Sequence, residues 1–448
     1  MSSFFEFAKK IISIDSSVSQ GTVEIVDYFN DLARSFGFLT EIQEGLIDGV
    51  VQRNIIVSDK LLESKSNVLF VSHLDTVDPG VYSLWDKTEF NPFNASLSGD
   101  SIYGLGAATG KIDFLCKLLA MKSLKDNGEP ILVTLLGSYG RESGMEGIKR
   151  FLQHNKNNFT YALVAEPSSN DFICSSIGLV NIEITIPYAD EEMVQLNKSL
   201  NSENFETQSR LFQGKVAHPL SPDWDENAIH KMFEYLGQLP KGLLLVDLDG
   251  GSHFNIVPER AYIELEVDGC IKESVTERLL GIYDAIKKLQ MDFKNHSCEG
   301  FEPNYPTINI GRAKKNDNYI RLHGSCRIPP SISETLYSSW IQQIKVTCDE
   351  QNATLRIMDY KPSYSLSLEN HFVKKSLELV ECLPGPLATS KSSRCSEANV
   401  LNRRGIEAVA FGAGIAMGNI YEPNECVNIK TLSQSRAIYE VFLRGVCE

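Results

Sequence analysis

The sequence predicts an α/β protein in which a three-layer domain is interrupted by an inserted α+β domain. Short apolar runs typical of buried strands alternate with helix-like segments over the first part of the chain. From about residue 177 the strands instead alternate apolar and polar side chains, and from about residue 370 the first pattern returns. We therefore expect residues 1–177 and 366–448 to form one domain and residues 178–365 to form the insertion.

The elements of the first domain follow from its apolar periodicity. Apolar residues recur at helical spacing over three segments, residues 2–12, 20–36 and 112–124. Short apolar runs bounded by polar or turn residues indicate strands at residues 40–43, 54–57, 68–71, 131–136 and 162–165.

Polar side chains follow three of these strands, at the point where each strand ends. His73 and Asp75 follow residues 68–71, Arg141 and Glu142 follow residues 131–136, and Glu166 follows residues 162–165. In α/β sheets, ligands bind outside the carboxyl ends of the strands, so we expect these side chains to share one edge. Histidine is the commonest metal ligand in proteins, which makes this edge a candidate metal or catalytic site.

The insertion is expected to be built from strands with one exposed face and from helices. Strands are predicted over residues 179–187, 243–248 and 261–267, near 308 and over 320–326, and helices near 228–236 and over 275–289 and 331–348. We interpret this order as two copies of one strand-helix-strand-strand unit. The Lys- and Asn-rich stretches at 155–158 and 314–317 indicate solvated loops.

Composition excludes several classes of function. A formal net charge of −15 argues against a nucleic-acid-binding protein, which would carry a basic face. No apolar run of about 18 residues exists, so no membrane span is expected, and the first residues lack the pattern of a secretory signal. Ten scattered cysteines without a Cys-x-x-Cys pair indicate reduced thiols, so we expect a cytoplasmic protein.

Several motifs, in order along the chain, resemble the co-catalytic zinc peptidase and deacylase family. That family includes acetylornithine deacetylase, succinyl-diaminopimelate desuccinylase, glutamate carboxypeptidase, aminoacylase and aminoacyl-histidine dipeptidase. The matching segments are His73-Leu-Asp75-Thr-Val, Tyr103-Gly-Leu-Gly-Ala-Ala-Thr109-Gly-Lys111, Arg141-Glu142-Ser-Gly144, Ala165-Glu166-Pro167-Ser168, Gly412-Ala-Gly414 and Tyr421-Glu-Pro423-Asn424-Glu425. The resemblance implies a zinc-peptidase-like catalytic domain with an inserted lid, and two lid copies resemble the dipeptidase branch.

The resemblance also implies a centre of two zinc ions, and this chain departs from it at three positions. It assigns one ion to His73, Glu166 and a bridging Asp, and the other to Glu142, a late His and the same Asp. The bridging position holds Thr109, the late His position holds Tyr421, and the water-activating Glu position holds Arg141.

These three replacements argue against the two-zinc chemistry. A Thr hydroxyl is a poor zinc ligand, because zinc takes thiolate, imidazole or carboxylate, and Asp113 lies a helical turn beyond Thr109. Arginine stays protonated and so cannot act as a general base. Its guanidinium can instead bridge carboxylates where an ion would sit. We therefore expect no metal, or one zinc on His73, Glu142 and Glu166, with an unusual two-metal site as the remaining alternative.

Residues that grip a substrate are better preserved than those that bind metal. The resemblance implies that His218 supports the oxyanion of the scissile carbonyl, and that Asn255 and Arg327 hold the carboxylate end of the substrate. It places Glu397, in Ser396-Glu397-Ala398, on a rim loop opposite the metals. An Arg fork suits a carboxylate.

Three functions remain open from the sequence. The first is binding of an amino acid, small peptide or acyl-amino acid, either without hydrolysis or with metal-free acyl or amide chemistry that uses Arg141, His218 and Tyr421 as electrostatic groups. The second is a mononuclear-zinc dipeptidase or deacylase with Asp75 or Glu397 as base. The third is a scaffold partner of an active homologue. A monomer and a homodimer are both compatible with the sequence.

Overall fold

The computed structural model describes residues 2–59, 67–141, 143–155, 158–201, 206–215, 226–254, 256–266, 274–381 and 388–445. They form two compact units: unit 1 is Met1–Ser175 with Tyr364–Glu448, and unit 2 is Ser176–Ser363. The predicted fold class, an α/β domain interrupted by an inserted α+β domain, is confirmed.

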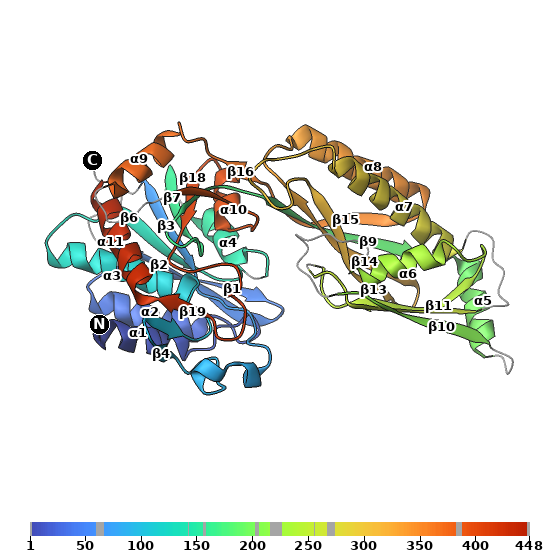
Figure 1. The fold of residues 1–448 in the computed structure, drawn as a ribbon, viewed down its shortest axis with the longest axis horizontal. Helices are drawn as coiled ribbons and strands as arrows, with labels where there is room; N and C mark the ends of the chain where they lie inside the picture. The colour runs from blue at the N-terminus through green and yellow to red at the C-terminus, as the bar shows by residue number, and fades with distance from the viewer. Residues whose placement is uncertain are drawn as a thin grey trace. The chain divides into compact units, whose positions relative to one another are not determined.

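Unit 1 is organised around a nine-stranded mixed sheet (Figure 1). Its strand order is β1-β2-β6-β3-β7-β18-β8-β16, with β17 paired to β8. The strands are β1 Leu39–Ile47, β2 Val50–Ser58, β3 Val68–His73, β6 Val133–Ser138, β7 Tyr161–Ala165, β8 Phe172–Ser176, β16 Tyr364–Ser365, β17 Thr389–Ser392 and β18 Glu407–Phe411. The neighbours β6, β3, β7 and β18 run parallel. A smaller sheet joins β4 Ser96–Ser98, β5 Ser101–Tyr103 and β19 Cys426–Asn428.

Helices cover both faces of this sheet, which gives the three layers (Figure 1). One face carries α1 Ser2–Ile12, α2 Val23–Ser35, α3 Gly110–Asp126, α9 His371–Val380 and α11 Ile429–Gly445, and the other carries α4 Glu146–His154 and α10 Glu397–Arg403. Along β3, Val68 and Phe70 pack in the first core, whereas Leu69 and Val71 pack in the second. A strand buried on both faces is apolar throughout, which explains the continuous apolar run in the sequence.

Unit 2 is built on one seven-stranded antiparallel sheet in the order β10-β12-β11-β13-β14-β9-β15. Its elements are β9 Gly178–Pro187, α5 Asp190–Leu200, β10 Thr207–Gln213, α6 Ala228–Leu236, β11 Leu244–Gly251, β12 Arg260–Glu266, α7 Val275–Phe293, β13 Thr307–Lys315, β14 Tyr319–Ile328, α8 Glu334–Glu350 and β15 Thr354–Lys361. Helices α6, α7 and α8 pack on one face of the sheet. The interpretation as two repeats stays a prediction.

The structure corrects one predicted loop in unit 2. Lys314 and Lys315 do not belong to a solvated loop but end strand β13, paired with Arg321 and Ile320 of β14. Polar α5, β10 and β15 were likewise not predicted, because the sequence signal for a strand or helix comes from its apolar face. Ala313 is the apolar residue that keeps this end of β13 on the core.

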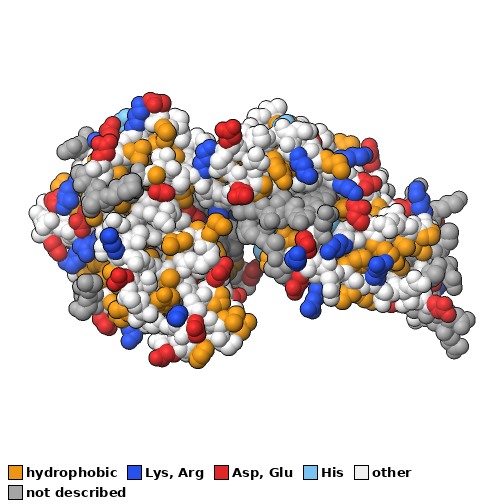
Figure 2. All heavy atoms as spheres, viewed as in Figure 1, with side chains coloured by type: hydrophobic (Ala, Val, Ile, Leu, Met, Phe, Trp, Pro, Cys, Tyr) orange, Lys and Arg blue, Asp and Glu red, His pale blue; other side chains and the backbone are white. Residues whose placement is uncertain are grey.

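The visible surface of each unit carries acidic and basic side chains close to one another (Figure 2). In the part of the chain that the structure describes, no helix combines the length and apolar character needed to cross a membrane.

Candidate functional site

The candidate site lies at the carboxyl edge of the parallel strands of unit 1. His73 is the last residue of β3, Asp75 follows it, and Glu166 comes directly after β7. Arg141 lies three residues beyond the end of β6. Because β6, β3 and β7 are parallel neighbours, their carboxyl ends deliver all four side chains to one edge of the sheet.

His73 is buried and both of its ring nitrogens are engaged. Its Nδ1 lies 2.9 Å from the backbone oxygen of Asp75, and its Nε2 lies 3.3 Å from the backbone nitrogen of Gly110. Because the Gly110 N–H donates, Nε2 is the acceptor and Nδ1 carries the proton. Burial, assisted by the positive charge of Arg141, holds the pKa of His73 well below its ordinary value. The ring is therefore neutral.

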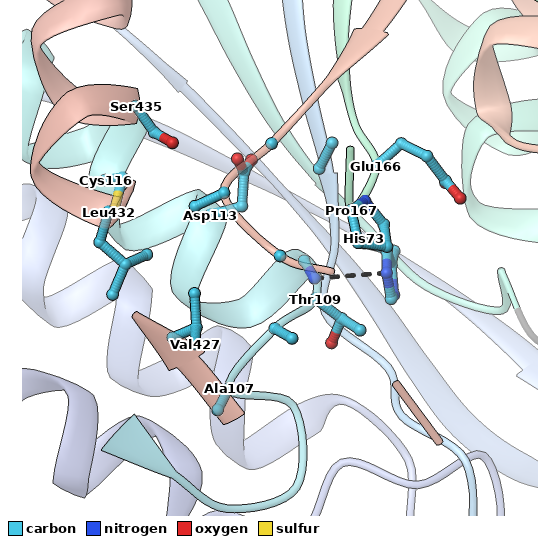
Figure 3. A pocket seen from close by; sticks show the side chains of 16 residues that line it. His73, Ala107, Thr109, Asp113, Cys116, Glu166, Pro167, Val427, Leu432 and Ser435 are labelled. Carbon is cyan, nitrogen blue, oxygen red and sulfur yellow. Dashed lines mark hydrogen bonds between the residues drawn. The ribbon is translucent and has the colours of Figure 1, made fainter. Parts of the chain in front are cut away.

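The contact on Nε2 depends on glycine at the start of α3. A Cβ on Gly110 would lie 1.9 Å from the backbone oxygen of His73 and 2.7 Å from its ring. Any other residue would therefore push the helix away from the imidazole. Figure 3 shows this hydrogen bond as a dashed line next to Thr109, the residue that precedes the helix.

A narrow cavity borders His73, Thr109 and Glu166. The centre of a water molecule can occupy about 20 Å³ of this cavity, so the cavity has room for about one water molecule. At its far end lie Asp113, Cys116 and Ser435 (Figure 3). The Asp113 carboxylate is engaged there by other side chains.

Asp113 belongs to a separate buried cluster. Its carboxylate accepts hydrogen bonds from Ser72 Oγ at 2.7 Å and from the Tyr439 hydroxyl, and it forms an ion pair with Lys117 Nζ at 2.7 Å. Lys117 also donates to the backbone oxygen of Val71 at 2.8 Å. The groups of this cluster satisfy one another.

Beside His73, two guanidinium groups and two carboxylates form a second cluster, in which all the side chains except that of Arg394 are buried. Arg141 Nη2 lies 2.6 Å from Glu166 Oε2, and Arg394 Nε lies 3.3 Å from Glu166 Oε1. Glu397 Oε2 lies 3.8 Å from Arg141 Nη1, and its other oxygen accepts from Ser138 Oγ at 3.2 Å. We call Arg141, Glu166, Arg394 and Glu397 the charge quartet.

The charge quartet is close to neutral, as its burial requires. Taking a charge out of water costs several kcal/mol unless an opposite charge or hydrogen bonds compensate it. Burial raises the pKa of Glu397, and the neighbouring Arg141 opposes this rise. The two cations thus balance two carboxylates that would otherwise repel each other.

Tyr421 contacts the charge quartet through Arg394. The Arg394 guanidinium carbon sits 5.4 Å from the centre of the Tyr421 ring, within the range of a cation–π contact. The sequence analysis missed Arg394 as a site residue. Charge balance could have indicated Arg394, because Glu166 and Glu397 together need a second cation besides Arg141.

Those donors that the family resemblance assigns to zinc and that the structure describes are engaged with other partners. His73 Nε2 accepts an N–H, and both oxygens of Glu166 lie against guanidinium groups. Thr109 stands at the bridging position, and its hydroxyl is a poor zinc ligand. Among the described residues, no group of three His, Cys, Asp or Glu side chains could hold a metal ion. Glu142 lies outside the described residues.

The remaining predicted residues are distributed over both units. Asp75 is fully buried beside His73, with Oδ1 3.8 Å from Nδ1. Glu397 is not on a loop but begins helix α10, which Ser396 caps, and it is buried. Arg327 lies in β14 of unit 2 and is 5% exposed. His218 and Asn255 lie outside the described residues.

Two further motif residues support the loop before α3. Glu425 is buried and accepts a hydrogen bond from the backbone nitrogen of Ala108 at 2.8 Å, and burial raises its pKa to about 7. Lys111 donates to the backbone oxygen of Ile14 at 2.9 Å, and burial lowers its pKa to about 8. They fix the segment that brings Gly110 against His73.

Comparison with solved structures shows that other proteins share this fold. The chain is 15% identical to aminoacylhistidine dipeptidase of Vibrio alginolyticus, with a TM-score of 0.64 over 98% of this chain and 96% of that one. A dinuclear metal binding peptidase of Bacillus subtilis gives 10% identity and a TM-score of 0.51 over 99% and 97%. These likenesses show the fold.

Sequence comparison identifies the family. Succinyl-diaminopimelate desuccinylase of Ehrlichia ruminantium (strain Gardel) is 22% identical over 261 residues, 54% of this chain and 62% of that enzyme. The chain thus matches about three-fifths of the length of this curated relative. The model of Peptidase family M20/M25/M40 matches residues 69–445. The chain therefore belongs to this family of zinc peptidases and deacylases.

Proposed function

We propose that this protein binds an amino acid, a small peptide or an acyl-amino acid at the carboxyl edge of the unit 1 sheet, without a two-zinc centre. The ligand class is supported by family membership. The observation that carries the proposal is the buried ion pair between Arg141 and Glu166, at 2.6 Å.

Arg141 competes with any metal for Glu166. A guanidinium is always charged and offers a planar fork of donors that matches a carboxylate. A metal cation near Glu166 would have to displace Arg141 and Arg394 while both stay charged and close by. The quartet therefore takes the place of an ion as the compensating charge of this edge.

His73 supports the same proposal from the other side of the cavity. Its Nε2 would have to lose the Gly110 N–H before it could ligate a metal, so the first turn of α3 would have to move. Zinc chemistry also needs a nearby base, and Arg141 cannot supply one.

In this proposal the side chains bind and orient the ligand. Arg394 is the more exposed guanidinium of the quartet, with 25% of its side chain accessible, so an incoming carboxylate reaches it first. Arg141 and Tyr421 then act as electrostatic groups and Asp75 fixes His73. His218, Asn255, Arg327 and Glu397 remain proposed ligand contacts.

Metal content is the direct test. Elemental mass spectrometry of protein purified without chelator, before and after soaking in zinc, should find far less than one zinc per chain. The variant that combines Arg141→Glu with Thr109→Asp should bind more zinc than the wild type. One or two zinc ions per wild-type chain that His73→Ala removes would overturn the proposal.

Ligand binding is tested separately. Thermal shift against amino acids, dipeptides and N-acyl amino acids should give stabilisation by at least one class, with and without chelator. Failure of every compound to stabilise the protein would contradict the proposal. Amine release that chelator abolishes would favour the mononuclear-zinc amidohydrolase, and co-purification with an active homologue would favour the scaffold.

A further inference from the structure

Two loops at the carboxyl edge of the unit 1 sheet expose large apolar side chains. One loop, residues 74–95, follows β3, and the other, residues 412–425, follows β18. They hold six of the eighteen large apolar side chains that are exposed in the part of the chain that the structure describes. The six are Val81, Tyr82, Leu84, Phe90, Ile415 and Met417, which are between 46% and 91% exposed. We call them the apolar rim.

Both loops begin next to the candidate site. Because β3, β7 and β18 are parallel neighbours, the two loops start at the sheet edge that carries this site. Gly414 lines the cavity of the site, and Ile415 follows it directly. Further along the same loop, the centre of the Tyr421 ring lies 5.4 Å from the guanidinium carbon of Arg394. The loop of residues 412–425 therefore connects the apolar rim to the cation that meets the ligand carboxylate in the proposed function.

Asn424 holds the two loops together. Its Oδ1 accepts from the backbone nitrogen of Lys87 at 3.0 Å, and its Nδ2 donates to the backbone oxygen of Leu84 at 3.3 Å and to Asp86 Oδ1 at 2.6 Å. Trp85 is buried and anchors the first loop, because its Nε1 donates to a backbone oxygen of that loop at 3.0 Å. The apolar rim thus projects from a support that hydrogen bonds and a buried ring hold in place.

The exposed charges of the two loops are mainly negative. They are four carboxylates and one cation, namely Asp78, Asp86, Glu89, Glu422 and Lys87. A ligand with a second anionic group would bring that group close to these carboxylates, and juxtaposed like charges reject a ligand. An uncharged apolar chain carries no such penalty. The two loops therefore favour a ligand whose only negative charge is the carboxylate that Arg394 meets.

We propose that the ligand of unit 1 carries one carboxylate and a large apolar chain, and that the apolar rim binds this chain. Clustered exposed apolar side chains mark interaction sites, and ligand sites combine apolar surface with a few polar groups. A two-fold contact with a second copy of the chain would instead bring the same carboxylates face to face. This inference deepens the proposed function, on which it rests for the carboxylate at Arg394.

Titration calorimetry of the full chain with three N-acylglycines tests the proposal. N-octanoylglycine should bind at least about tenfold more tightly than N-acetylglycine, because each fully buried CH₂ group is worth about fourfold in affinity. N-succinylglycine, which adds a second carboxylate, should bind no more tightly than N-acetylglycine. Equal affinity for the octanoyl and acetyl compounds, or tighter binding of the succinyl compound than of the octanoyl compound, would overturn the inference.

A matched pair of variants locates the effect. Leu84→Ser/Met417→Ser removes two side chains of the apolar rim and should lower the octanoyl-to-acetyl affinity ratio at least about fivefold. Leu200→Ser/Met291→Ser removes an exposed Leu and an exposed Met from unit 2 and should leave this ratio unchanged. Equal ratios in the two double variants would contradict the role of the apolar rim.

Two further measurements separate the possible failures. Octanamide, which lacks the carboxylate, should bind more weakly than N-octanoylglycine, and equal binding would break the link to Arg394. A dimer in size-exclusion chromatography that Leu84→Ser/Met417→Ser dissociates would assign the apolar rim to a second copy and overturn the inference. If no N-acylglycine binds, the function proposed for unit 1 falls together with the inference. Binding that ignores the length of the acyl chain would remove only the inference.

Discussion

The two units differ in whether their charged side chains are buried and paired or exposed and unpaired. In unit 1 Arg141, Glu166 and Glu397 of the charge quartet are buried and Arg394 is partly exposed, and two guanidinium groups balance two carboxylates within 2.6 to 3.8 Å. In unit 2, Lys314 of β13 and Arg356 of β15 stay exposed without an ion pair among the described residues, although each lies directly opposite a carboxylate, Asp249 and Glu183 respectively. Burial enforces charge neutrality, whereas water solvates an exposed charge that has no ion-pair partner.

This contrast separates two roles for an arginine. Arg141 compensates a carboxylate inside the protein, so its loss should be felt as lost stability. Arg356 is exposed and solvated, so its loss should change the free energy of unfolding little. The predictions below test this separation, and they run from the largest expected effect to the smallest.

Replacing Arg141 by Met should have the largest effect. It leaves Glu166 and Glu397 buried with only Arg394 to compensate them, and breaking a buried ion pair costs about 3–5 kcal/mol. Urea unfolding should show this loss of free energy of unfolding. Lys149→Met, which breaks an exposed pair with Glu146, should cost less than about 1 kcal/mol.

A second variant sharpens the assignment to charge. Arg141→Met combined with Glu166→Gln removes a cation and its carboxylate together, so it should be more stable than Arg141→Met alone. A loss below about 1 kcal/mol for Arg141→Met would mean that the guanidinium is not the compensating charge.

Gly110→Ala tests the close approach of α3 to His73. The new Cβ would lie 1.9 Å from the His73 backbone oxygen, so the helix start must shift, and we expect a loss of up to about 3 kcal/mol in urea unfolding. Gly281→Ala in α7 is the control, since its Cβ would meet only the flexible side chain of Gln351. Equal stability of the two variants would contradict the close contact.

Glu425 should make unit 1 less stable as the pH rises. Burial raises its pKa to about 7, so between about pH 4.5 and 7 the folded chain holds a proton that the unfolded chain has lost. Stability from this group is therefore fully present below about pH 4.5 and is lost as pH rises through about 7. The stability of wild type relative to Glu425→Gln should fall by about 3 kcal/mol across this window.

An exposed carboxylate nearby provides the control for this pH effect. Glu422 lies three residues before Glu425 and is exposed. Glu422→Gln should leave the slope of stability against pH unchanged in urea titrations at several pH values. A parallel pH dependence of wild type and Glu425→Gln would show that burial of Glu425 does not shift its titration.

The sequence allowed the fold and one edge of the site to be predicted, because both rest on local patterns. Apolar runs indicated β3, β6 and β7. The residues that follow these strands lie at the carboxyl edge of the sheet, as expected for an α/β sheet. The motif residues led to the family, which the comparison confirms.

Contacts between distant segments could not be predicted in the same way. The partnership of Arg394 with Glu166 joins residues far apart in the chain, and the hydrogen bond from Gly110 to His73 depends on the packing of a helix against a strand. The end of strand β13 was not predicted because Lys314 in a Lys- and Asn-rich stretch indicates a loop, while the strand is defined by pairing with β14.

The smallest effect is expected at Lys314, in the absence of ligand. Lys314 stands between Arg321 of β14 and Asp249 of β11, but Asp249 is already paired with Arg312. Lys314→Gln should therefore mainly relieve the like-charge contact and raise the free energy of unfolding by about 0.2–0.5 kcal/mol at low salt. The gain should vanish at about 1 M NaCl, where screening acts within about 3 Å. Lys288→Gln on α7 should show no such gain. If Lys314→Gln instead lowered stability by more than about 0.5 kcal/mol, Lys314 would be a compensated charge like Arg141, and the contrast between the two units would fail at this residue.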